Sequence, residues 1–134
     1  MTIESAAEFV RLRFSDDPAE YRRAAGEAAA PGVWEAVIRE YPDARVWVAQ
    51  NKTVPVEILE ILAVDADPQV RHMVAMKRKI TPHILDILAS DSEETVRMRV
   101  VMNKKSTKII LERLAQDSSE QVRFAAATRL GDLG

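Results

Sequence analysis

The chain has 134 residues, a net charge of −2 and no cysteine, with 47% hydrophobic and 30% charged side chains. This length favours one domain with a sizeable core, and the lack of cysteine excludes disulfides and thiolate-bound metals or clusters. The small net charge does not indicate a nucleic-acid or membrane role. No apolar run approaches the roughly 18 residues of a membrane span, and residues 1–8 lack the basic and then apolar segments of a signal peptide. We therefore expect a cytoplasmic protein.

The first predicted helix covers residues 3–14, where Phe9 and Val10 occur at helical spacing with Ala6. Asp17 is the predicted N-cap of the next helix, because Pro18 suits its first position and Glu20 completes a capping box. Short helices then alternate in two series, termed A and B. The A helices are predicted at residues 31–40, 54–64, 82–90 and 107–116, and the B helices at 18–27, 43–51, 68–77, 93–103 and 120–130.

The ends of these helices carry their own signals. Thr53, Thr81 and Ser106 are predicted N-caps of A helices, and Gly131 is predicted to end the last B helix. No segment alternates between apolar and polar residues for long enough to predict a strand.

Several residue types recur along the chain at a step of 26, among them Arg45, Arg71, Arg97 and Arg123. A fixed period between about 20 and 50 residues is typical of a solenoid, in which each unit buries its apolar face on its neighbours. We therefore predict an all-α solenoid of two-helix units as a single domain, residues 1–134. It comprises an N-terminal capping helix (1–16), four repeats (17–41, 42–67, 68–93 and 94–119) and a C-terminal half repeat (120–134).

An Asp precedes an Arg by six positions in three successive units, with Val directly before the Arg, and this pattern resembles HEAT repeats. The sequence Val-Arg-x-x-Val-Ala, followed by Thr-Pro-x-x-x-Leu-x-x-Leu-Ala-x-Asp, is similar to the bacterial leucine-rich repeat variant family. The resemblance covers about residues 17–130. It implies a right-handed superhelix that binds partners, with a ladder of Asp–Arg hydrogen bonds along the stack. The unit here is mostly longer than that of the variant family, and the cysteine cluster of some members is absent, so no iron–sulfur role is implied.

The Asp and Arg positions also have a direct interpretation. Arg offers several donors in a fixed planar geometry, so each Arg is expected to pair with the preceding Asp and to close the turn. The alternative is a row of arginines that binds phosphates. The structural role is expected for Asp65, Arg71, Asp91, Arg97, Asp117 and Arg123.

The outer face of the B helices is unexpectedly apolar. If Val70, Val74 and Ala75 face inward, positions 72, 73 and 76 face outward, and the equivalent positions of the four B helices from 43–51 onward hold a Trp, a Phe and four Met. Met is adaptable and Trp is a favoured anchor at interfaces, so the face is either a partner-binding groove or core. We expect positions 46, 72, 98 and 124 to be more buried than Trp47, Met73 and Arg99. The predicted binding residues, termed the B-helix face, are Trp47, Gln50, Met73, Met76, Arg99, Met102 and Phe124.

The turns from each B helix to the next A helix are basic. Dipole complementarity at the helix C-termini explains one cation per turn, but not three in succession. The surplus allows a phosphate-binding edge, although these turns lack the aromatics that single-strand binding prefers. This basic edge consists of Lys52, Lys77, Arg78, Lys79, Lys104 and Lys105.

No catalytic set is apparent. His72 and His83 lack a third ligand at metal spacing, and Trp47 with Asp43 is a poor match to a glycosylase site. We therefore expect a non-enzymatic module without metal, cofactor or membrane, which binds a protein partner through the concave B-helix face. Nucleic-acid binding along the basic edge and homodimerisation through the apolar face are the alternatives.

Overall fold

The computed structural model describes residues 2–133 and is all-α. This range contains ten α-helices, one 3₁₀-helix and two strands of two residues each. The described residues divide into two compact units between Leu62 and Ala63, here termed the first unit and the second unit. Within residues 2–133, no helix has the length and apolar character needed to cross a membrane.

The first unit combines short helices with a two-stranded parallel sheet, in which Ile3 is aligned with Ala29. Its buried centre contains Phe9 and Trp34, whose rings meet edge to face with centroids 5.1 Å apart. The elements in chain order are β1 (Thr2–Ile3), α1 (Ala6–Arg13), α2 (Pro18–Gly26), β2 (Ala28–Ala29), α3 (Pro31–Glu40), η1 (Pro42–Ala44), α4 (Arg45–Gln50) and α5 (Val56–Leu62).

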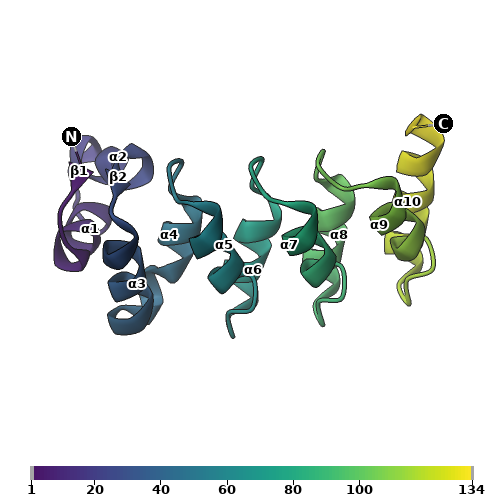
Figure 1. Ribbon diagram of the computed structural model, residues 1–134, viewed down its shortest axis with the longest axis horizontal. Helices are drawn as coiled ribbons and strands as arrows, with labels where there is room; N and C mark the ends of the chain where they lie inside the picture. Colours follow the sequence, from purple (N-terminus) through teal and green to yellow (C-terminus); the bar gives the residue numbers. More distant parts are fainter. Residues whose placement is uncertain (1, 134) are drawn as a thin grey trace. The chain divides into compact units, whose positions relative to one another are not determined.

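The second unit is regular. Its elements are α6 (Pro68–Ala75), α7 (Pro82–Leu88), α8 (Glu94–Met102), α9 (Lys108–Leu114) and α10 (Glu120–Leu133). The B helices α6, α8 and α10 contact one another in succession, and the A helices α7 and α9 pack against them. The turns after α6 and α8 lie on one edge of this unit, and the turns after α7 and α9 lie on the opposite edge (Figure 1).

The repeated apolar positions form the core of the second unit. Val70, Val74 and Ala75 of α6 are buried, as predicted for the inward face of a B helix. Leu85 and Leu111, one period apart in the A helices, are fully buried as well. Helices this short are not stable alone, so this burial is what maintains them.

The Asp–Arg pairs differ in register from the prediction. Arg71 donates from Nε to Asp91 Oδ2 at 2.7 Å, and Arg97 donates from Nε to Asp117 Oδ1 at 2.9 Å. Each arginine therefore binds the carboxylate of the following sequence repeat. It reaches only the backbone carbonyl of its own preceding Asp, at 2.7 Å for Asp65 and 2.8 Å for Asp91. Each Arg thus contacts its preceding Asp as expected, but only through the backbone carbonyl, and the carboxylate it binds belongs to the Asp 20 residues further along the chain, because packing brings the two turns together. Arg123 binds the carbonyl oxygens of Asp117 and Ser118.

Several predicted helix ends are also corrected. Thr81 caps α7 as predicted, but Thr107 rather than Ser106 caps α9, since the Ser106 hydroxyl donates instead to the Val100 carbonyl. The Thr53 hydroxyl donates to Asn51 Oδ1 at 2.6 Å rather than capping α5. Gly131 does not end the last helix, because α10 continues to Leu133.

The N-terminal part of the first unit departs from the prediction in two further ways. Ile3 belongs to β1 and not to the first helix. Asp17 caps α2 through Ala19 N as predicted, but the capping box is not formed, because Glu20 accepts hydrogen bonds from Arg11 and Ser15 instead.

Candidate functional site

The B-helix face of the second unit lies at the surface. Met76 is 47% exposed, Met102 57% and Phe124 74%, while Met73 is half-buried. Positions 72 and 98 are also half-buried. The expectation that position 124 is more buried is wrong, because α10 is the last described helix and no other helix covers this side chain. In this unit Met76, Met102 and Phe124 are therefore accessible apolar surface, whereas positions 72, 73 and 98 are partly packed.

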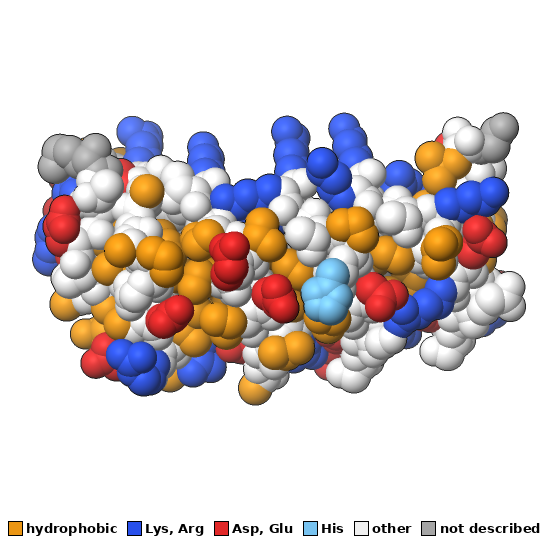
Figure 2. Space-filling model, in the orientation of Figure 1, with side chains coloured by type: hydrophobic (Ala, Val, Ile, Leu, Met, Phe, Trp, Pro, Cys, Tyr) orange, Lys and Arg blue, Asp and Glu red, His pale blue; other side chains and the backbone are white. Residues whose placement is uncertain are grey.

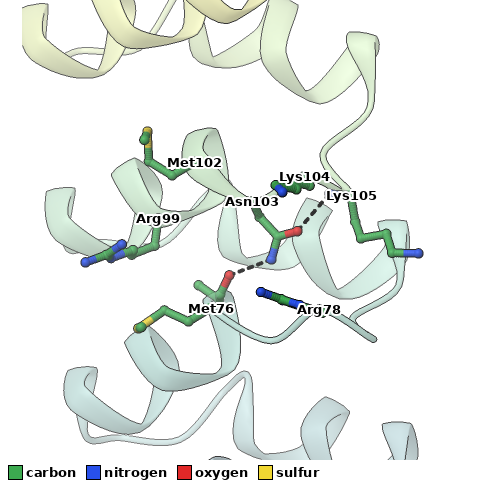
Figure 3. Close-up of a pocket in the computed structure, with 8 residues that line it drawn as sticks. Met76, Arg78, Arg99, Met102, Asn103, Lys104 and Lys105 are labelled. Atoms are coloured by element: carbon green, nitrogen blue, oxygen red, sulfur yellow. Dashed lines mark hydrogen bonds between the residues drawn. The ribbon is translucent and has the colours of Figure 1, made fainter.

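An open pocket of about 300 Å³ lies between the C-terminal ends of α6 and α8. It joins residues from both predicted surfaces. Met76, Arg99 and Met102 of the B-helix face lie toward one side, and Arg78 and Lys105 of the basic edge lie toward the other (Figure 3). The residues that line it are Ala75, Met76, Arg78, Arg99, Met102, Asn103, Lys104 and Lys105.

Asn103 holds the two sides of the pocket in place. Its side-chain amide donates to the carbonyl oxygens of Ala75 and Lys77 at 2.8 and 2.9 Å, and its Oδ1 accepts the backbone N–H of Lys105 at 2.8 Å (Figure 3). It thereby ties the end of α6 to the turn after α8. Because this buried amide forms all of these hydrogen bonds, it holds in place the backbone segments that carry the methionines and the cations of the pocket.

The sequence interpretation missed this asparagine, although a signal for it exists. Asn51 lies two periods earlier and makes the same set of bonds in the first unit, donating to Ala24 and Glu27 and accepting from the Thr53 N–H. Lys77 occupies the position between the two asparagines, which interrupts the pattern.

Four cations line the pocket without a carboxylate partner. Arg78, Arg99, Lys104 and Lys105 are exposed, and within residues 2–133 none of them forms an ion pair. The C-termini of α6 and α8 each contribute about half a negative charge, which offsets only about one of the four. The pocket is therefore a local positive centre in a chain whose net charge is −2.

Two titratable side chains flank the pocket without lining it. Arg99 Nε donates to His72 Nε2 at 3.2 Å, and burial, with a further effect of Arg99, lowers the pKa of His72. This keeps the imidazole neutral and able to accept the hydrogen bond. Burial, with a smaller effect of Lys79, lowers the pKa of Lys77 to about 8.

The basic edge is present in the second unit. Lys and Arg side chains protrude along the edge that carries the turns after α6 and α8 (Figure 2). Lys79 is exposed and Lys77 is half-buried, and neither lines the pocket.

The remaining predicted residues lie elsewhere. Trp47, Gln50 and Lys52 belong to the first unit, where Trp47 is half-buried and the Arg13 guanidinium covers its ring at 3.5 Å from the centroid. Phe124 borders a separate shallow depression on α10 with Arg123. The structure thus brings together only part of the predicted set.

Residues 2–133 contain no group of three or more His, Asp or Glu side chains placed to hold a metal ion. Comparison with models of known families, with curated proteins and with solved structures found no match to the chain.

Proposed function

We propose that this chain is a non-enzymatic interaction module that binds a protein partner through the concave B-helix face. The observation that carries the proposal is the exposure of Met76, Met102 and Phe124 on three successive B helices. Large apolar side chains that cluster at the surface favour a docking site, and the flexible thioether of Met adapts to varied partners.

The proposed framework is a right-handed solenoid of HEAT-like, leucine-rich repeat variant units. The 26-residue step, the succession of contacts from α6 to α8 to α10, and the Arg–Asp pairs between units support this framework. A solenoid presents one helix of every unit on the same face, which would make the B helices a continuous surface for an extended partner.

Double substitution of Met76 and Met102 by Asp tests the proposal. Proteins captured from the native cell extract by the immobilised chain are identified by mass spectrometry, and the proteins that bind this face should be lost with the double variant. Ile109→Asp is the matched control, because Ile109 is 79% exposed on α9 and lies outside the B-helix face. Far-ultraviolet circular dichroism verifies that each variant is folded. If the double variant and the control capture the same proteins as the parent chain, the proposal fails.

Nucleic-acid binding along the basic edge is the second candidate, since the exposed cations in the turns after α6 and α8 have no ion-pair partner at positions 78, 104 and 105. Phosphate binding weakens steeply with salt, whereas apolar docking does not. Retention of single-stranded DNA or RNA that disappears at moderate salt, and that survives the Met76 and Met102 substitutions, would favour this candidate. Sedimentation of the chain alone shows whether the same face joins two copies.

A further inference from the structure

The pocket between α6 and α8 has two chemically different sides. Met76 and Met102, each about half exposed, line the side formed by the helices, and Arg99, which donates to His72, lies between them in Figure 3. Arg78, Lys104 and Lys105 line the side formed by the turns (Figure 3). A ligand that satisfies both sides must carry an apolar group and a negative charge a short distance apart.

We propose that this pocket binds an acidic segment of the protein partner, with one large apolar side chain between Met76 and Met102 and a carboxylate facing Arg78, Lys104 and Lys105. The inference rests on the proposed function, because it specifies which chemistry of a partner the B-helix face recognises. It adds that the basic edge and the apolar face act on the same ligand.

The size of the pocket matches a side chain rather than a larger ligand. Small-molecule and cofactor pockets span about 300–1,000 Å³ and enclose most of their ligand. This pocket, at about 300 Å³ and open to solvent, is at the lower limit of that range. One apolar side chain with its neighbouring backbone fills such a space, while the rest of the segment continues over the surface.

The charge of the pocket specifies an anion. Four cations surround it, and no carboxylate of residues 2–133 pairs with any of them. The Arg78 guanidinium offers the paired donors that suit a carboxylate, and the two lysines add charge on the same side. A carboxylate bound here would replace repulsion between the cations with charge-assisted hydrogen bonds.

The apolar side favours a peptide over a nucleic acid. Single-strand binding prefers aromatic platforms on which bases stack, and no aromatic side chain lines the pocket. Phosphates alone would leave Met76 and Met102 unused. An acidic peptide with an apolar anchor uses both the two methionines and the cations of the turns.

A phage-displayed library of random peptides, selected on the immobilised full chain, tests the inference. The enriched peptides should carry Asp or Glu within a few residues of Leu, Ile, Met, Phe or Trp. In fluorescence anisotropy, the double variant Arg78→Glu/Lys105→Glu should weaken their binding by at least about tenfold, because it reverses two of the facing charges. Lys108→Glu, an exposed cation on α9 outside the pocket, is the matched control and should have little effect.

Each other outcome has a defined meaning. Enriched peptides without acidic residues, whose binding is lost with Met76→Asp/Met102→Asp but unchanged by the charge reversal, overturn this inference and leave the proposed function standing. No enrichment, together with capture of cellular proteins that does not depend on Met76 and Met102, overturns both. Binding of single-stranded DNA that depends on Arg78 and Lys105 but not on the methionines assigns the anion to a nucleic acid, and this also overturns the inference.

Discussion

The two units of this chain use the same repeat in different ways. In the second unit, the Arg71–Asp91 and Arg97–Asp117 pairs close successive turns with nearly identical geometry. In the first unit, Phe9 packs against Trp34, and the Arg13 guanidinium lies over the Trp47 ring. Met76 and Met102, at the ends of α6 and α8, are 47% and 57% exposed, whereas Trp47 in α4 is half-buried beneath the Arg13 guanidinium.

Under the proposed function, this difference predicts which of the two units contributes most to partner binding. The exposed Met76 and Met102 side chains contribute little to the packing of the second unit and remain available to a ligand. When the same face packs internally, as at Trp47, it contributes to stability and is less available. We therefore expect partner binding to depend mainly on the second unit.

The largest expected effect comes from breaking a pair in the regular unit. Arg97→Ala leaves the Asp117 carboxylate, whose side chain is 8% exposed, without its cation. We expect the free energy of unfolding to fall by about 3–5 kcal/mol, as measured by urea denaturation, because a buried charge then lacks compensation.

Arg123→Ala is the control for this variant. Arg123 occupies the same repeat position, but it is exposed and donates only to two backbone carbonyls. Its removal should cost about 0.5–1.5 kcal/mol. Equal losses for both variants would show that the carboxylate pairs do not distinguish the regular unit.

Substitution of Asn51 and Asn103 tests whether the same side-chain hydrogen bonds stabilise both units. Asn103→Ala and Asn51→Ala each remove a buried amide that donates to two carbonyls and accepts one N–H. We expect similar losses of about 1–3 kcal/mol in both cases, because each leaves several buried backbone groups without a partner. A much smaller loss at Asn51 would mean that aromatic packing maintains the first unit without these hydrogen bonds.

Lys77 occupies the same repeat position as Asn51 and Asn103. Because Lys77 is ionisable, we expect it to make the free energy of unfolding depend on pH. Burial lowers its pKa from 10.5 to about 8 in the folded chain, so the unfolded chain binds more protons between these values. The free energy of unfolding should therefore rise as the pH increases from 8 to 10.5, by on the order of 1–2 kcal/mol, which is less than the full shift implies because solvent screens this half-buried ammonium. Lys77→Met should abolish this rise in urea denaturation across the same pH range. A rise that persists in the variant would assign the effect to other groups.

The smallest effect is expected at the covered tryptophan. Arg13→Ala removes the guanidinium above Trp47, which should cost about 0.5–1 kcal/mol, as typical for a cation–π contact near the surface. Acrylamide quenching of tryptophan fluorescence should increase, because Trp34 is fully buried and only Trp47 gains exposure. Unchanged quenching would show that Arg13 does not limit access to this face.

The period of the repeat predicts most of the helices and the inward positions, because both follow from local spacing of apolar residues. The register of the Arg–Asp pairs does not follow in the same way. Arg71 lies six residues after Asp65 and twenty before Asp91, and only the packing of α6 on α8 selects the second carboxylate. Sequence distance alone favours the wrong partner.

The sequence predicted the apolar residues and the basic residues of the pocket separately, but not that they line the same pocket. Met76 and Arg78 belong to separate predicted surfaces, on the assumption that the B helix extends to residue 77. In the structure α6 ends at Ala75, which places the turn cations beside the last methionine. Helix ends depend on contacts such as those of Asn103 with the Ala75 and Lys77 carbonyls, which join two repeats of the second unit and are not visible in the local sequence.

The offset register of the Arg–Asp pairs has a consequence for how such a chain can change in length. Arg71 and Arg97 each bind a carboxylate twenty residues further along the chain, in the next sequence repeat. Duplication or loss of one whole repeat therefore leaves every remaining Arg paired with an Asp. Insertion of a few residues within a helix would instead move the Arg out of reach of its Asp. We expect related chains to grow or shrink by whole units, which extends the surface offered to a partner without any change to the existing contacts.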